Sequence, residues 1–529
     1  MPACAVVAVA APVEVPLTVE VEVASAPVVV VAGTVTVSVL TTTAAVFEEP
    51  QAASKSPHKT AKERAFMGAS ITRATAAPRD TVEAVPEPTQ SDIQSIGGQL
   101  AKSLPRAWQA PRQTADNAVM NYVAKDPQLQ AALFRFVDVA PSGRSDAERA
   151  QQLIALLEEV EPPPRSVRAA IRLAHTPRGE QVLGASATTA VRQMAHRFIV
   201  GETLEQASGP LAELWRAGVA NSVDLLGEAT VTAAEADDYA TRCLQALEQL
   251  AGTSARLPPR PILEADSSGP LPRANLSVKL SALTPLMRPE APEAGVADVI
   301  RRLRPILQTA KRLGAHLHID TESLDSREAV FDAALGLLAE PEFKDGPSAG
   351  VVLQAYLTDS GEVLDQILGF AHANPRETPL TVRLVKGAYW DHELVHARQQ
   401  GWEAPVFDDK AATDRNFEAL TRRLLQARST VRVAIASHNL RSVSFAIAAS
   451  RALGAPDQDL ELQVLRGLGD PLQAALAKNG LRVRTYCPVG GLVAGMAYLV
   501  RRLLENSSQQ SFLQAQASGV PLKQLLAAP

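Results

Sequence analysis

The sequence has few cysteines, little net charge and none of the common nucleotide or zinc-protease motifs. Its three cysteines, Cys4, Cys243 and Cys487, lie far apart and show no CxxC spacing. A disulfide framework and a cysteine-ligated metal site are therefore excluded, and a reducing compartment is favoured. The net charge of -5 gives no reason to expect nucleic acid as a partner. No GxGxxG follows the first predicted strand, and neither Walker A nor HExxH occurs, so Rossmann, P-loop and HExxH-type zinc sites are not supported.

The N-terminal stretch differs in composition from the rest of the chain, because it alternates Val, Ala, Thr and Pro. Val23–Phe47 is uncharged and long enough to cross a bilayer. It nevertheless contains seven Ser and Thr residues, and no basic n-region precedes it, so a secretory signal is not expected. We predict a disordered low-complexity extension over residues 1–88. A membrane anchor, or a true start at Met67, is the alternative.

Residues 89–206 carry a helical pattern. Apolar residues recur at spacings of three and four in Ala147–Val160 and Ser166–Leu173, and the EPPPR string at Glu161–Arg165 separates the two. This stretch predicts a small α-helical domain with a packing role.

Eight short β-branched runs, each mostly apolar and each followed by a helical pattern, occupy the chain from about residue 220 to 486. They are Ser222–Gly227, Asn275–Leu280, His316–Asp320, Gly350–Tyr356, Leu380–Val385, Val431–Ser437, Glu461–Leu465 and Leu481–Tyr486. Strands that alternate with helices indicate a parallel sheet, and eight such units close most naturally as a (β/α)8 barrel. The fold class is therefore α/β, with a doubly wound open sheet as the alternative.

Polar side chains end seven of these eight runs. In chain order they are Glu228, Lys279, Asp320, Gln354 with Tyr356, Arg383 with Lys386, His438 with Asn439, and Tyr486. Such a series predicts a site at the carboxyl-terminal mouth of a barrel. The seventh run ends in GLGDP, for which we predict a turn and no chemistry.

Two further groups suggest what the mouth binds. Arg383, Lys386 and His438 suit a pyrophosphate or an anionic ring, and Tyr389 with Trp390 offers flat surface for stacking. His316, His318 and Asp320 alternate onto one strand face as a metal trio, but no second ligand cluster accompanies them, and we expect no metal.

A pair of adjacent arginines marks the last predicted helix. Tyr498, Arg501, Arg502 and Glu505 share one helical face, and two neighbouring guanidiniums form a planar receptor for a carboxylate. A solvated Arg-Arg pair with Glu505 as its helical ion-pair partner is the alternative.

Several strings carry a resemblance to a known family. NLSVKLSAL, HLHID, VVLQAY, VRLVKGAYWDHE, ASHN, TYCPVG and YLVRRLLEN occur in this order between about residues 90 and 515. The chain resembles the proline dehydrogenase domain of bacterial proline utilization A. The resemblance implies a distorted (β/α)8 barrel over 207–515, noncovalent FAD at its mouth, and no metal. It also implies oxidation of L-proline to Δ1-pyrroline-5-carboxylate, with electrons passed to membrane quinone.

The resemblance also implies roles for individual residues. Arg501 and Arg502 would pair with the proline carboxylate, and Glu228 would pair with the first arginine to gate the site. The substrate pocket would be walled by Lys279, Asp224, Tyr389, Tyr486 and Tyr498. The flavin contacts would be Asp320, Val352, Gln354, Arg383, Lys386, Gly387, Ala388, Trp390, His438, Asn439 and Glu505.

The sequence departs from the family in three places. Asp408 stands in a segment where family members commonly have Thr. The chain ends at Pro529, after a tail over 516–529, without the family's aldehyde dehydrogenase domain, so a separate pyrroline-5-carboxylate dehydrogenase is the expected partner. No ribbon-helix-helix segment is apparent, so DNA binding is not implied. We expect a cytoplasmic protein, with peripheral association at the inner face of the plasma membrane as a further option.

Two other functions remain open at this point. One is a Schiff-base lyase barrel in which Lys279 is the nucleophile. The other is a catalytically idle remnant that binds flavin or a partner.

Overall fold

Residues 18–23, 26–31, 86–105, 126–139, 145–174, 195–227, 230–491 and 519–529, with isolated positions 176, 182, 185, 186, 189, 495 and 498, are described by a computed structural model. Most of Val23–Phe47 lies outside them. So do Glu228, Arg501, Arg502 and Glu505.

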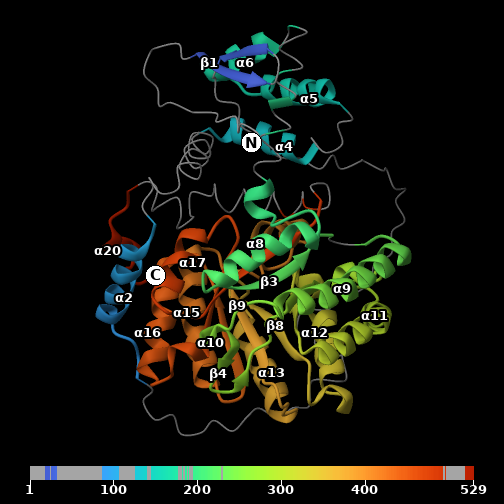
Figure 1. Cartoon of the computed structure of the whole chain (residues 1–529), viewed down its shortest axis with the longest axis vertical. Coiled ribbons are helices and arrows are strands. Elements are labelled where there is room, and N and C mark those ends of the chain that lie inside the picture. The colour runs from blue at the N-terminus through green and yellow to red at the C-terminus, as the bar shows by residue number, and fades with distance from the viewer. Residues whose placement is uncertain are drawn as a thin grey trace.

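Eight parallel strands close into a barrel in the order β10-β11-β12-β3-β6-β7-β8-β9 (Figure 1). The strands are β3 (Ala220–Leu225), β6 (Asn275–Lys279), β7 (His316–Asp320), β8 (Ser348–Gln354), β9 (Leu380–Val385), β10 (Val431–Ala436), β11 (Leu460–Leu465) and β12 (Val483–Val489). Each lies at one of the eight predicted runs, so the closed α/β barrel is confirmed and the open sheet is wrong.

The last strand runs further than the sequence suggested. The last predicted run ends at Tyr486, but β12 continues to Val489. The Pro488 carbonyl accepts a hydrogen bond from the Val200 amide at 2.8 Å, and the Gly490 amide donates to the Gly201 carbonyl at 3.0 Å. The segment before α8 (Leu204–Arg216) therefore pairs with the end of β12, where a proline without an amide proton is tolerated.

The strands are less uniformly apolar than predicted. In β6, Leu276 and Val278 belong to the main hydrophobic cluster, whereas Asn275, Ser277 and Lys279 bond to side chains of neighbouring strands. This period of two indicates that apolar residues face the helices and polar residues face the barrel interior.

The helices between the strands form the outer layer. They are α9 (Ala233–Ser254), α11 (Pro292–Leu313), α12 (Leu324–Leu338), α13 (Ser360–Ala373), α14 (Trp390–Gln400), α15 (Lys410–Gln426), α16 (Leu440–Ala452) and α17 (Asp470–Lys478). Local signals fix their ends: Thr232 and Glu235 form a capping box at the start of α9, and α11 ends at Gly314 with φ 60°.

A layer of buried ion pairs closes the amino-terminal end of the barrel. Asp266 lies in the β4 (Ala265–Asp266) and β5 (Gly269–Pro270) hairpin. Its carboxylate accepts hydrogen bonds from Arg432 at 3.2 Å and Arg482 at 3.1 Å, and Glu461 accepts two from Arg484 at 2.8 and 3.0 Å.

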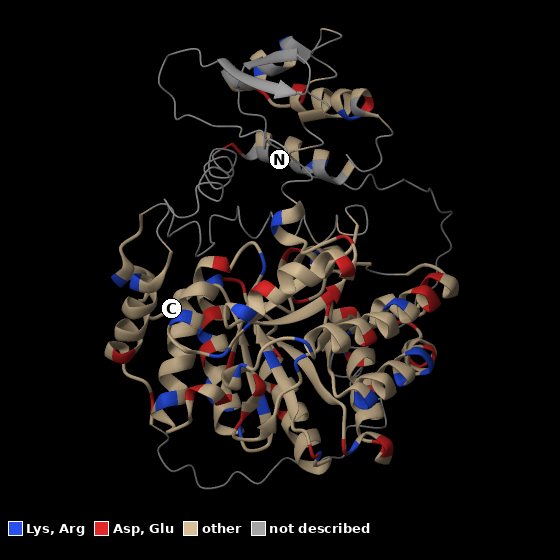
Figure 2. Ribbon diagram, viewed as in Figure 1, with Lys and Arg blue, Asp and Glu red and all other residues tan. Residues whose placement is uncertain are grey.

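On the ribbon both signs of charge are interspersed, with no single-signed stretch in view (Figure 2).

The N-terminal helices divide into two groups. α2 (Gln90–Ser103) lies beside α16 and α17 of the barrel, and the short α20 (Leu522–Leu525) joins it there (Figure 1). Gly97 permits this close approach, because a Cβ atom there would lie 2.6 Å from Leu526. The second group, α4 (Pro127–Val139), α5 (Asp146–Glu158) and α6 (Arg165–Ala174), packs in sequence order.

The N-terminal extension, for which composition predicts disorder, contains two described strands. β1 (Thr18–Val23) and β2 (Ala26–Val31) pair with each other in antiparallel register. Their valine content suits paired strands. Among the helices described for this chain, none has both the length and the apolarity needed to cross a membrane.

Candidate active site

Side chains from four strands meet on one carboxylate at the carboxyl-terminal mouth. Asp320, the last residue of β7, accepts hydrogen bonds at Oδ1 from Arg383 Nη1 at 2.6 Å and from Ser277 Oγ at 3.1 Å. Its Oδ2 accepts a hydrogen bond from the Tyr486 hydroxyl at 2.7 Å. The Arg383 guanidinium also lies 5.5 Å from the centre of the Tyr486 ring, within cation–π range. The structure thus brings together residues that the sequence placed on separate strand ends.

A second buried pair lies beside this group. Lys279 Nζ is 2.5 Å from Asp224 Oδ1, and their side chains are 6% and 0% exposed. Burial opposes the charge on Lys279, but the carboxylates of Asp224, Asp320 and Glu322 outweigh it and raise the pKa of Lys279. Burial and nearby carboxylates also raise the pKa of Tyr486 well above its ordinary value, so its phenol is a neutral donor.

One buried polar atom in each of Asp224, Gln354 and Arg383 has no hydrogen-bond partner among the described residues. The three atoms are Asp224 Oδ2, Gln354 Oε1 and Arg383 Nε. Gln354 is oriented through its other amide atom, since Nε2 donates to the Glu322 carbonyl at 2.9 Å. Buried polar atoms are normally satisfied, so two acceptors and one donor here fit a ligand that carries both donors and acceptors.

The three basic residues that we predicted to act together, Arg383, Lys386 and His438, lie in different parts of the mouth. Arg383 points to Asp320, whereas Lys386 pairs with Asp414 of α15 and lies 5.6 Å from the Phe417 ring centre. Burial, with the charge of Lys410, lowers the pKa of Lys386 to about 8 against the opposing effect of Asp414.

His438 and Asn439 are held at the start of α16. His438 Nε2 accepts a hydrogen bond from the Leu465 amide at 2.9 Å, which assigns the proton of a neutral ring to Nδ1. The Asn439 side chain caps the helix by accepting from the Ser442 amide at 3.1 Å. Both therefore have structural partners besides any ligand.

The loop after β9 carries the predicted stacking residues. Trp390 donates its indole proton to the Phe407 carbonyl at 2.9 Å, and Tyr389 and Trp390 pack against Tyr356 in a small apolar cluster. Gly387 has φ 127°, and a Cβ atom there would lie 2.1 Å from the Tyr356 ring, so this position requires glycine. The two other predicted contacts of this region differ in exposure, since Ala388 is exposed and Val352 is buried opposite Arg383.

Tyr498 lies in a hydrophobic cluster that links the mouth to the segment before α8. Its ring is 4% exposed, and the cluster contains Phe198, Leu226 and Leu468, with Tyr486 packed against it. Tyr486 and Tyr498, both predicted pocket residues, therefore share one cluster.

His316, His318 and Asp320, the possible metal trio of the sequence, bond to other groups. His316 and His318 bond to each other at 3.1 Å, and His316 bonds to Ser348 at 2.9 Å. Burial lowers the pKa of His316 to about 3 and that of His318 well below its ordinary value. Asp320 instead bonds to Arg383, as described above.

Comparison with known proteins identifies the family. Residues 207–515, more than half of the chain, match the family model described as proline dehydrogenase. The chain belongs to the proline dehydrogenase family. Residues 90–198 match the model described as the proline utilization A N-terminal domain.

Individual relatives agree with this assignment. Bifunctional protein PutA of Salmonella typhimurium is 34% identical over 359 residues, which cover 66% of this chain and 26% of that protein. Proline dehydrogenase 1 of Bacillus subtilis is 27% identical over 319 residues, which cover 60% of this chain and 89% of that protein. The chain thus aligns with about a quarter of the length of the PutA relative.

A solved structure shares the fold. Proline utilization A from Bdellovibrio bacteriovorus, inactivated by N-propargylglycine, superposes with a TM-score of 0.75 at 33% identity. The match covers 83% of this chain and 44% of that one. The sequence-based resemblance to this family is therefore confirmed.

Two residues of the mouth, Ser277 and Arg466, were not among the predicted site residues. Ser277 bridges Asp320 and Arg383, and its position two residues before Lys279 on the same strand face was the available signal. Arg466 follows β11, the strand to which we assigned no chemistry. Its amide donates to the Tyr486 carbonyl at 3.2 Å, and its Nε atom is buried without a partner among the described residues.

Proposed function

We propose that this protein oxidises L-proline to Δ1-pyrroline-5-carboxylate with bound FAD. The observation that carries the proposal is the Asp320–Arg383–Tyr486 group beside the Lys279–Asp224 pair, at the mouth of a barrel that belongs to the proline dehydrogenase family. The relatives' names supply the substrate class, and the mouth of a (β/α)8 barrel is where such enzymes act.

The residues of the mouth fit a flavin. When bound, FAD would accept the two electrons that leave proline as its C–N single bond becomes a double bond. Arg383 would donate from its free Nε atom toward the electron-rich side of the ring, and Gln354 would accept through Oε1. Asp320 would hold the Arg383 guanidinium in that orientation.

The predicted outer contacts would hold the remainder of the cofactor. Lys386 and His438 would face its phosphates, and Trp390 would present a flat surface, while Asn439, Gly387, Ala388 and Val352 would line the site. Glu505 belongs to this set by sequence only.

Substrate binding would depend on Lys279 and the arginine pair. Lys279 would present a fixed positive charge, because its raised pKa and its contact with Asp224 keep it protonated. Tyr389, Tyr486 and Tyr498 would shape the pocket. Arg501 and Arg502 would bind the proline carboxylate, and Glu228 would gate them.

The reaction needs an electron acceptor and a consumer of the product. We propose membrane quinone for the first and a separate pyrroline-5-carboxylate dehydrogenase for the second. A membrane quinone and a separate dehydrogenase together imply a cytoplasmic location with peripheral membrane association, which is part of the proposal.

The Schiff-base lyase alternative is disfavoured by the state of Lys279. A lysine nucleophile needs a lowered pKa, whereas the neighbouring carboxylates raise the pKa of Lys279. The idle remnant, where it binds flavin, differs from the proposal only in turnover.

A spectral experiment separates the three functions. Purified protein is expected to retain equimolar FAD noncovalently and to lose its yellow absorbance anaerobically when L-proline is added. A yellow protein that L-proline does not bleach favours the idle remnant. A colourless protein that borohydride links covalently to its substrate at Lys279 favours the lyase.

A further inference from the structure

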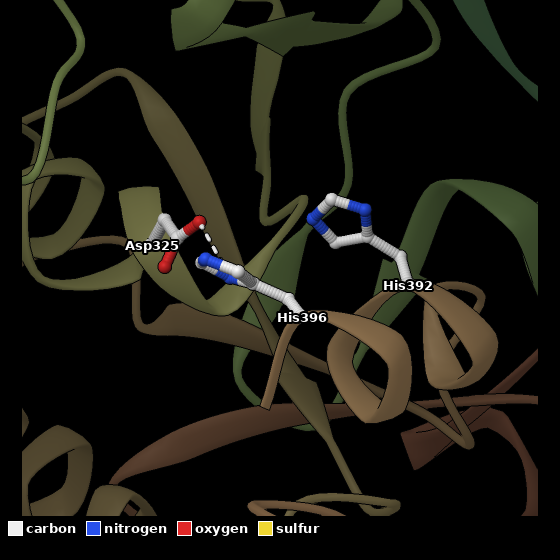
Figure 3. A group of neighbouring side chains, drawn as sticks. All are labelled: Asp325, His392 and His396. Atoms are coloured by element: carbon white, nitrogen blue, oxygen red, sulfur yellow. Dashed lines mark ion pairs between the residues drawn. The ribbon is translucent and has the colours of Figure 1, made fainter. Parts of the chain in front are cut away.

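A cluster of two imidazoles and one carboxylate lies on the outer layer of the barrel, outside the proposed active site. His392 and His396 lie one turn apart on α14, and Asp325 lies in the first turn of α12 (Figure 3). One ligand atom from each side chain lies within 4.8 Å of the other two. His396 Nδ1 is 3.6 Å from Asp325 Oδ2, the pair joined by the dashed line in Figure 3.

We propose that Asp325, His392 and His396 form a binding site for a divalent transition-metal ion of the zinc class. Two histidines at i and i+4 project from the same face of a helix, which is the spacing that lets both rings reach one ion. Neutral imidazole and carboxylate together suit zinc and its neighbours in the first transition series rather than calcium or magnesium, which prefer oxygen ligands alone. Water would complete the coordination.

The geometry needs only a small adjustment to hold the ion. Bonds of about 2.1 Å to a tetrahedral ion place ligand atoms about 3.4 Å apart, so the widest gap must close by no more than about 1.4 Å. Asp325 and His392 are exposed and His396 is partly exposed, so their side chains can rotate without disturbing the core.

The two helices that supply the ligands are already fixed to each other. Glu393, between the two histidines, is buried, and its carboxylate accepts a hydrogen bond from the Leu324 amide at the start of α12 at 2.8 Å. The backbones that carry the ligands are thereby held in place before any ion binds, which lowers the entropic cost of binding.

The position of the cluster suggests what a bound ion would do. Asp325 lies five positions after Asp320, and His392 lies two positions after Trp390. An ion would therefore link α12 to α14, the helices that follow β7 and β9 at the barrel mouth. The cluster itself does not depend on the reaction proposed above.

Calorimetric titration of the full-length, tag-free protein with Zn²⁺ tests the proposal. We expect saturable equimolar binding, and His392→Gln and His396→Gln should each weaken it by at least about tenfold. Asp325→Asn should weaken it less, because two imidazoles remain. His372→Gln, which removes an exposed histidine from the last turn of α13, is the matched control and should bind as wild type does.

Two further measurements guard against binding elsewhere on the chain. Co²⁺ should give tetrahedral d–d absorption bands in wild type that the His392→Gln/His396→Gln double variant lacks. Zn²⁺ should raise the unfolding temperature of wild type and leave that of the double variant unchanged. Absence of saturable Zn²⁺ binding, or equal affinity in wild type and the double variant, would overturn the site.

Discussion

Replacement of Lys279 by Met isolates the buried pair at the barrel mouth. Lys279 Nζ lies 2.5 Å from Asp224 Oδ1, and the Asp224 side chain is fully buried. Methionine keeps most of the side-chain length, so the main change is the loss of one charge. Removing one partner of a buried ion pair typically costs about 3–5 kcal/mol, because the other charge remains buried and uncompensated. We therefore expect the free energy of unfolding to fall by about that amount at neutral pH.

The loss should depend on pH in a defined direction. Burial already raises the pKa of Asp224 above its ordinary value of 3.8, and removal of the lysine should raise it further. A carboxyl group whose pKa is raised in the folded state destabilises the fold only when it is ionised. The variant should therefore lose little of its free energy of unfolding at low pH. Its stability should then fall as pH rises from 3.8 through the folded-state pKa of Asp224, by at most about 1.4 kcal/mol per pH unit for one proton.

Urea unfolding of wild type and Lys279→Met from about pH 5 to about pH 8 measures this dependence. The double variant Lys279→Met/Asp224→Asn removes both charges and should recover most of the loss together with the wild-type pH slope. A loss under about 1 kcal/mol at neutral pH, as for an exposed pair, would refute the reasoning. So would a double variant as unstable as Lys279→Met.

Four other outcomes are expected, two from the structure and two, for Arg502 and the N-terminal extension, from the sequence. Arg383→Met should lower the reduction potential of the flavin and slow its reduction by proline, with a smaller effect on the affinity for proline. A reduction potential equal to that of wild type would place Arg383 away from the flavin ring. Asp266→Ala removes the buried carboxylate to which both Arg432 and Arg482 bond at the opposite end of the barrel, so urea titration should show a loss of about 3–5 kcal/mol with unchanged turnover at low temperature. Near-wild-type stability would contradict the ion-pair layer. Arg502→Met should raise the Michaelis constant for proline by orders of magnitude while FAD stays bound, and an unchanged constant would remove the arginine pair from substrate binding. A chain that begins at Met67 should bind FAD and oxidise proline at the full-length rate with a soluble electron acceptor. Loss of flavin would show that the N-terminal extension packs on the catalytic part.

The barrel was predictable because its signal repeats. Each strand is a short β-branched run, each is followed by a helical pattern, and eight repeats leave few ways to close the sheet. The ends were less predictable, since β12 continues through Pro488, where Val200 and Gly201 bond to it. That contact joins residues almost three hundred positions apart, which no local pattern reveals.

The core of the site was predictable for a related reason. Parallel strands bring their carboxyl ends to one mouth, so Asp320, Arg383 and Tyr486 had to lie near one another. The direction of each side chain was not predictable. Lys386 pairs with Asp414 because α15 passes beside it, and that depends on how the helix packs.

The residues that were missed show two further limits. Ser277 was overlooked although it shares a strand face with Lys279, because a single hydroxyl is a weak sign of a site. Arg466 was overlooked because the glycines after it indicate only a turn. The proposed metal site shows a similar limit. The spacing of His392 and His396 is visible in the sequence, but the position of Asp325 beside them depends on how α12 lies against α14.

A single-turnover experiment tests the central claim most directly. Anaerobic protein, expected to carry the FAD proposed above, is mixed with a limiting amount of L-proline. Loss of the yellow absorbance is then compared with the amount of Δ1-pyrroline-5-carboxylate trapped by an aromatic amino-aldehyde. A proline dehydrogenase forms one product molecule for each flavin reduced, and we predict that ratio. Flavin that stays oxidised in the presence of L-proline, or that is reduced without formation of the product, would contradict the account.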